Sequence, residues 1–136
     1  MGLEKLIMHN VVRLYIAKRV IKMNVEEVWF ELKEILKTRR FIPTLKEQAT
    51  AEVLEITDDA IIIRLKKGVE RKMEKSYFYK AIDILKKNGR VRQQNLQHID
   101  TARYVLGALT LLPYFVKIRE FDATEGKHKW FVKFAK

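Results

Sequence analysis

The chain has 136 residues, 48% of them hydrophobic, and a formal net charge of +11 at pH 7, which suits one core and a negatively charged partner. It contains no cysteine, which excludes disulfides, thiolate metal sites and a thiol nucleophile. Charged side chains interrupt the apolar run of the first twenty residues, which argues against a signal peptide or a membrane span there and favours a cytoplasmic protein. The many Lys, Glu and Ile residues and the few amides favour a heat-adapted source.

The N-terminal part begins with two expected helices. Residues 3–22 are expected to be helical because their apolar side chains can share one face, although the run VVRLYIA would also suit a strand. Asn24 followed by Glu27 resembles a capping box, and an apolar stripe from Val25 to Leu36 predicts a second helix that ends near Arg39. Pro43 marks the exit from this helix.

A β-meander is expected next. Residues 51–73 alternate apolar and polar side chains, as Ile61, Ile63 and Leu65 illustrate. Turn residues stand at 58–59, where two aspartates are adjacent, and at 67–68, where Lys precedes Gly. The pattern predicts two or three short antiparallel strands.

The C-terminal part is expected to hold three helices. Ser76 is suited to cap a first helix that ends at Asn88 and Gly89. After a short strand over 90–93, residues 95–98 have room for little more than one helical turn, with Leu96 and Ile99 pointing inward. Asp100 is suited to cap a third helix over 101–112, which ends at Pro113.

A β-hairpin is expected to close the chain. The segments YFVKIREF and HKWFVKF alternate in polarity and are separated by DATEGK, where Gly126 allows a tight loop. Residues 76–136 carry 12 basic and 5 acidic side chains, a net charge of +7. The net charge is +4 for residues 1–48 and zero for residues 49–75. Such a basic region is typical of proteins that bind phosphate backbones. Alternatively, the charge serves solubility, or attracts an acidic protein or a membrane surface.

The order helix, short strand, short helix, helix, hairpin in ILKKNGRVRQQNLQHIDTARYVLGALTLLPYFVKIRE resembles the winged helix-turn-helix superfamily of DNA-binding domains. The resemblance covers residues 76–136 and rests on the order and spacing of the elements. Together with the N-terminal helices and the small antiparallel β-meander expected over residues 1–75, which pack against this domain or mediate self-association, it predicts an α+β fold. It also implies that the third helix enters the major groove of DNA while the hairpin forms a basic wing.

The resemblance and the amide-rich run at 92–98 together define the candidate site. Of the eight Asn and Gln residues in the chain, four lie between positions 93 and 97, where neutral amides can bond phosphate oxygens or the edges of adenine. In the alternative interpretation, Asn95 caps the short helix and the glutamines are ordinary solvated surface. The residues expected to contact nucleic acid are Arg92, Gln93, Gln94, Asn95, Gln97, Thr101, Arg103, Tyr104, Lys127, His128 and Lys129.

Several of these residues allow a second interpretation. Arg103 could bond guanine or phosphate in a bidentate way, or it could pair with Asp100 on the same helix. Tyr104 could rest on a sugar or base, or cover the core, and Trp130 is expected in the core of the hairpin. Gly107 costs a helix about 1 kcal/mol relative to Ala, which indicates that another backbone or the nucleic acid approaches it closely. Thr110 is expected on the same outward face as Gly107.

The sequence predicts a non-enzymatic protein without a cofactor or a metal. The spacing of Asp58, Asp59, Glu70 and Lys72 resembles the metal-binding core of restriction-type nucleases, but acid-x-Lys triplets are expected by chance in so charged a chain. The first functional hypothesis is a transcriptional regulator or accessory module that binds double-stranded DNA, as a homodimer held by its N-terminal helices. The alternative is a winged-helix protein-interaction module for an acidic partner, which the scarcity of polar groups on the third helix favours.

Overall fold

The computed structural model describes residues 24–135. The helix expected over residues 3–22, and the dimer contacts expected from it, lie outside these residues. The elements in chain order are α2 (Val25–Arg39), β1 (Phe41–Pro43), β2 (Thr50–Ile56), β3 (Ala60–Arg64), β4 (Glu70–Glu74), α3 (Lys75–Asn88), the 3₁₀ turn η1 (Gln93–Leu96), α4 (Ala102–Leu109), β5 (Phe115–Asp122) and β6 (Lys127–Phe134). The fold is α+β, as predicted, with a four-stranded antiparallel sheet and a separate hairpin.

The predicted helix over 25–39 is confirmed as α2. Its first turn is capped by Asn24, whose side-chain oxygen accepts from the backbone N–H of Glu27 at 2.9 Å. The helix ends at Arg40, which adopts a left-handed conformation with φ of 53°. Its apolar stripe faces the core, where the ring of Trp29 lies 5.3 Å from the ring of Phe78 on α3.

The predicted meander is confirmed as β2, β3 and β4, in a sheet whose order is β1-β2-β3-β4. Its turns lie at the predicted positions, and Gly68 has the positive φ of 84° that a glycine tolerates at no steric cost. The sequence did not predict β1, which pairs with β2 so that Pro43 lies opposite Thr50. A proline can occupy an edge strand because that strand needs hydrogen bonds on one side only.

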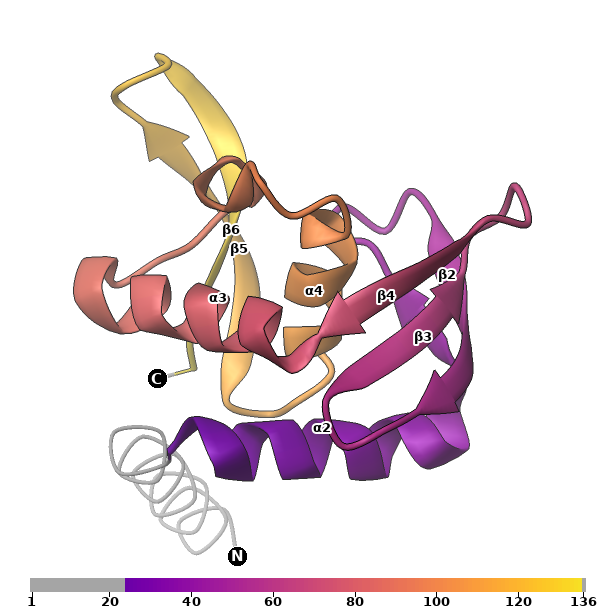
Figure 1. Ribbon diagram of the computed structural model, residues 1–136. Coiled ribbons are helices and arrows are strands. Elements are labelled where there is room, and N and C mark those ends of the chain that lie inside the picture. The colour runs from indigo at the N-terminus through magenta and orange to yellow at the C-terminus, as the bar shows by residue number, and fades with distance from the viewer. Residues whose placement is uncertain (1–23, 136) are drawn as a thin grey trace, which may run out of the picture.

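A single core joins the two predicted units. In Figure 1, α4 lies between α3 and the sheet, while α2 runs along the base of the molecule. Buried apolar residues from Val28 on α2 to Val132 on β6 form one continuous cluster. Residues on both sides of the expected boundary at 75–76 therefore share one interior, and β4 continues directly into α3.

The details of α3 and of the segment after it differ from the prediction. The helix begins at Lys75 with Glu74 at the cap position, so Ser76 lies inside the first turn and is not the cap. The C-terminal stop at Gly89 is confirmed, with φ of 78°. The short strand expected over 90–93 consists of one antiparallel bridge, Val91 with Val132 of β6.

The short second helix is the single 3₁₀ turn η1, which begins two residues earlier than predicted. Leu96 and Ile99 are buried, as predicted. The prediction that Asp100 caps the third helix is wrong, because Thr101 holds the cap position and the Asp100 carboxylate lies 3.4 Å from Arg71 on β4. The predicted hairpin is confirmed as β5 and β6, which pair in register from Phe115 opposite Phe134.

Candidate functional site

Helix α4 does not present the surface expected of it. Thr101 and Tyr104 are only 1% and 3% exposed, so the prediction that they project outward to contact nucleic acid is wrong. Gly107 is also buried, since an ideal Cβ built on it would lie 1.8 Å from the carbonyl oxygen of Pro43. Thr110 is partly buried, and its hydroxyl donates to the carbonyl of Gly107.

Strand β1 and the loop after it cover the outer face of α4. The backbone N–H of Leu45 donates to the carbonyl of Arg103 at 3.2 Å, which fixes the loop to the helix. Of the eight residues of α4, Arg103 alone is exposed, and the other seven are buried. In this arrangement α4 cannot enter a DNA groove.

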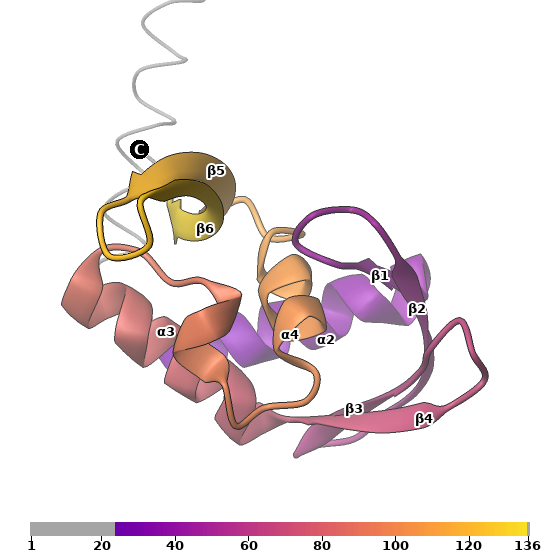
Figure 2. The ribbon, with the colours of Figure 1, turned by 90° about the horizontal axis from the view of Figure 1, so that it is seen from above.

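A cleft of about 520 Å³ lies beside the N-terminal end of α4. Its walls come from the loop after β1, from η1 with the residues that follow it, and from the turn between β5 and β6 with the first half of β6. Figure 2 shows these three segments arranged around α4 when the molecule is seen from above. Residues distant in the sequence therefore meet at one surface.

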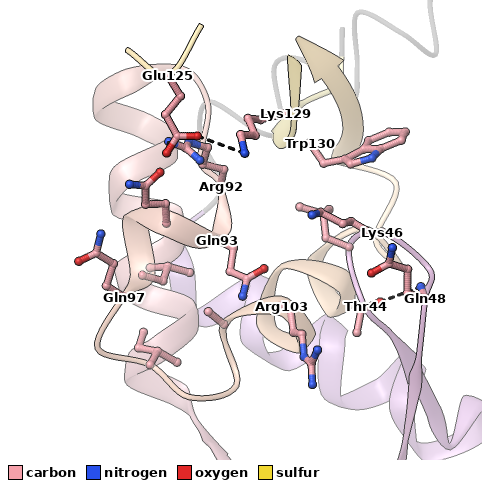
Figure 3. A pocket seen from close by; sticks show the side chains of 15 residues that line it. Thr44, Lys46, Gln48, Arg92, Gln93, Gln97, Arg103, Glu125, Lys129 and Trp130 are labelled. Carbon is pink, nitrogen blue, oxygen red and sulfur yellow. Dashed lines mark hydrogen bonds and ion pairs between the residues drawn. The ribbon is translucent and has the colours of Figure 1, made fainter. Parts of the chain in front are cut away.

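All four glutamines of the chain line this cleft. They are Gln48 on the loop after β1, Gln93 and Gln94 on η1, and Gln97 just after it. In Figure 3, Gln48 and Gln93 face the cleft from opposite sides, and Gln97 lies at its outer edge. No hydrogen bond joins any of the four side-chain amides to another residue within 24–135. The four amides are therefore free to bond water or a ligand.

The charged side chains in the part of the cleft that is uppermost in Figure 3 form ion pairs with one another or with Asp122. Arg92 Nη2 lies 2.9 Å from Asp122 Oδ2, an ion pair in which the N–H direction does not meet hydrogen-bond geometry, and 3.4 Å from Glu125 Oε1. Lys129 Nζ lies 3.1 Å from Glu125 Oε2. The hydrogen bond from Lys129 is the largest cause of the lowered pKa of Glu125, with a smaller contribution from Arg92. Within residues 24–135, Glu125 is the one acidic residue that lines the cleft, and it pairs with two of the cations.

Two further cations line the cleft without such a partner. Among residues 24–135, neither Lys46 nor Arg103 forms an ion pair. The alternative pairing of Arg103 with Asp100 does not occur, because Asp100 pairs with Arg71. The Arg103 guanidinium instead lies 5.2 Å from the ring centre of Tyr104. Both cations are exposed and available to an anionic ligand.

An apolar surface completes the cleft. Trp130 on β6 is only partly buried, and it lines the cleft above Lys46 in Figure 3. Its ring lies 5.5 Å from Lys117 Nζ, and Lys117 is in turn held by Glu47 at 2.9 Å. The buried side chains of Leu45 and Leu96 also contribute to the lining of the cleft. The expectation that Trp130 belongs to the core of the hairpin holds only in part.

The structure brings together about half of the residues that the sequence singled out. Six of the expected contact residues line the cleft, namely Arg92, Gln93, Gln94, Gln97, Arg103 and Lys129. Asn95 does not, because its side-chain oxygen accepts from the backbone N–H of Arg92 at 2.9 Å, which is the capping role of the alternative interpretation. Lys127 and His128 are the first two residues of β6, and they are exposed and lie outside the cleft lining.

Sequence reasoning missed the contributions of Lys46, Gln48 and Glu125. Gln48 carried one signal, as the sole glutamine outside positions 93–97. Nothing in the sequence indicates that it folds beside the other three, because β1 was not predicted.

The nuclease-like constellation is not assembled. Asp58 and Asp59 form the turn between β2 and β3, at the end of the β3–β4 ladder where Ala60 pairs with Glu74. Glu70 lies at the opposite end, paired with Arg64, roughly 13 Å away at about 3.3 Å per residue. No group of three or more His, Asp or Glu side chains within residues 24–135 could hold a metal ion.

No protein-family model, curated protein or solved structure matches the chain. No helix among residues 24–135 combines the length and the apolar character that a membrane crossing needs. Function has to be inferred from the residues and their arrangement.

Proposed function

We propose that the protein binds nucleic acid through the glutamine-lined cleft and the adjoining hairpin. The observation that carries the proposal is the meeting of all four glutamines with two exposed cations that have no ion-pair partner in the described chain. Amides offer donors and acceptors to base edges and phosphate oxygens, while cations neutralise phosphates. The net charge of +7 on residues 76–136 supports a polyanionic ligand.

We also propose that residues 75–134 form a winged helix whose third helix serves packing rather than groove reading. The antiparallel bridge of Val91 with Val132 supports this, because it joins the segment before η1 to β6 of the hairpin at a single residue pair. The contacts with nucleic acid then come from η1, the hairpin and the loop after β1, which covers α4. This arrangement suits an accessory nucleic-acid-binding module, including one that assists transcription.

The protein-interaction alternative loses its main support. The scarcity of polar groups on α4 favoured a protein-binding helix, but the burial of α4 under β1 accounts for that composition. An acidic protein partner would still be attracted by the same cations. A competition experiment between an oligonucleotide and an acidic polypeptide distinguishes a nucleic-acid ligand from an acidic protein.

Fluorescence anisotropy with labelled oligonucleotides, titrated from about 50 to 200 mM salt, tests the proposal. Binding should weaken steeply as salt rises. The double substitution Lys46→Ala with Arg103→Ala should lower the affinity and flatten the log–log salt slope by about 1.5, since each phosphate contact contributes about 0.7–0.9.

The matched control is Lys66→Ala with Lys67→Ala, which removes the same charge from the exposed turn between β3 and β4. This variant should retain most of the affinity. If wild type binds no oligonucleotide at low salt, the proposal fails. If polyglutamate competes as well as an oligonucleotide, the acidic-partner alternative replaces it.

A further inference from the structure

The size of the cleft restricts which form of nucleic acid can enter it. A volume of about 520 Å³ is typical of small-ligand sites and suits one or two nucleotide units, whereas a duplex could touch only its rim. The helix that would read a duplex groove is covered by β1, and Gly107 of that helix is in contact range of the Pro43 backbone. The cleft therefore favours a nucleotide that is not paired.

The lining of the cleft has the composition that an unpaired base requires. Trp130 provides a partly exposed aromatic ring, fixed on β6 by its pairing opposite Arg119. Stacking of a base on such a ring does not depend on which base is present. Gln48 and Gln93, which face the cleft from opposite sides, can each donate to and accept from a base edge.

Phosphate positions follow from the two cations without ion-pair partners in the described chain. In Figure 3, Lys46 lies beneath Trp130 and Arg103 lies at the far end of the cleft from it, so cations stand at both sides of the amides. A chain of nucleotides can contact both, whereas a single nucleotide bound at Trp130 contacts the nearer one. The spacing favours a strand over a free mononucleotide.

We infer that the cleft binds a single-stranded nucleic acid, with one unpaired base against Trp130, its edge at Gln48 and Gln93, and its phosphates at Lys46 and Arg103. The inference rests on the proposed function and specifies its ligand. It assigns Trp130 a binding role that its place in the hairpin alone does not require.

Tryptophan fluorescence provides the test, with an oligothymidylate of about 12 nucleotides as the probe. The single strand should quench Trp130, while Trp29, which is 2% exposed and donates its Nε1 hydrogen to the carbonyl of Asp58, contributes a constant background. The single strand should bind at least about tenfold more tightly than a hairpin duplex of equal charge and than thymidine monophosphate.

Three variants complete the experiment. Their affinities are measured by the anisotropy of a labelled oligothymidylate, because two of the variants lack the fluorescence of Trp130. Trp130→Ala should reduce affinity for the single strand by roughly 5- to 100-fold, and Trp130→Phe, which keeps an aromatic ring, should retain most of it. The control Phe121→Ala removes an exposed aromatic from the same hairpin outside the cleft and should leave affinity unchanged.

The possible failures are distinguishable. Equal or tighter duplex binding without quenching of Trp130 would overturn the single-strand inference while the proposed function stands. Binding of the mononucleotide as tightly as the oligonucleotide would also overturn it, since the ligand would then be a free nucleotide. Absence of binding by every probe would refute the proposed function itself.

Discussion

Replacing Gly107 by alanine tests the close contact between α4 and β1. The added Cβ would lie 1.8 Å from the Pro43 carbonyl oxygen and 3.1 Å from the carbonyl carbon of Thr44. These are backbone atoms of a paired strand and its continuation, so β1 would have to retreat by more than 1 Å. The hydrogen bond from Leu45 N–H to the Arg103 carbonyl would be lost or lengthened by that movement.

The expected magnitude follows from three opposing effects. Overpacking costs about 1–3 kcal/mol and a lost backbone hydrogen bond about 1 kcal/mol. The better helix propensity of alanine returns about 1 kcal/mol. The net loss should be about 1–3 kcal/mol in the free energy of unfolding, and Tm should fall by about 4–10 °C for a chain of this size.

Urea unfolding followed by circular dichroism measures the change, with an unchanged m-value as the sign that only stability has altered. The control is Ser76→Ala, an exposed helical position without a capping role, which should change stability by less than about 0.5 kcal/mol. The opposite outcome is that Gly107→Ala proves neutral, or stabilises the protein by the higher helix propensity of alanine alone. Either result would show that β1 does not lie against α4, and the argument that α4 is too covered to enter a DNA groove would be refuted.

Three further substitutions have expected outcomes. Glu125→Gln should raise oligonucleotide affinity and steepen the log–log salt slope by up to about 1, because it releases Lys129 from its ion pair; an unchanged slope would mean that Lys129 does not reach phosphate. The pKa of Glu120 is lowered below its ordinary 4.5 chiefly by the hydrogen bond from Lys133, so the stability it contributes is complete above pH 4.5 and is lost as pH falls through the lowered value. Glu120→Gln should therefore lower Tm slightly at pH 7, with a difference from wild type that closes toward pH 3; a difference independent of pH would contradict this. Thr101→Val removes a buried hydroxyl without a hydrogen-bond partner in the described chain and should leave stability unchanged or raise it by about 1 kcal/mol, measured by urea unfolding, and a clear loss would show that the hydroxyl is bonded.

Local patterns in the sequence predicted most of the elements because those elements are determined locally. The apolar stripe and the cap at Asn24 determine α2, and the alternation in residues 51–73 with its two turns determines three strands of the sheet. The turn at Gly89 and the hairpin follow from the same local rules. Strand β1 could not be predicted, because three residues ending in Pro43 are stabilised by pairing with β2 and by contact with α4 rather than by their own pattern.

The error over α4 has the same origin. The sequence shows an apolar stripe along this helix, but it also places Tyr104, Gly107 and Ala108 on the opposite face, and a helix that is apolar all round is buried. The sequence did not identify the segment that covers it. Once β1 is in place, the outer face of α4 is interior and the amides of η1 become part of a cleft.

The candidate site was predicted only where it is contiguous in sequence. Gln93, Gln94 and Gln97 form a visible cluster, whereas Gln48 and Lys46 approach them only because β1 and the loop after it fold over α4. Sequence spacing carries no information about such a contact between distant segments. The two cations without partners in the described chain became evident only from the ion pairs that the other charged residues form.

Side-chain amide NMR shows directly whether the glutamines of the cleft contact a bound oligonucleotide. The chain contains four glutamines and four asparagines, so its side-chain NH₂ signals are few enough to be followed one by one in a ¹⁵N–¹H spectrum during titration with an oligonucleotide. The signals of the glutamines in the cleft should shift, with Gln48 and Gln93 moving most, while those of Asn24 and Asn88 at helix ends stay in place. Shifts confined to backbone signals of the hairpin turn, with all four glutamine signals unmoved, would contradict this prediction.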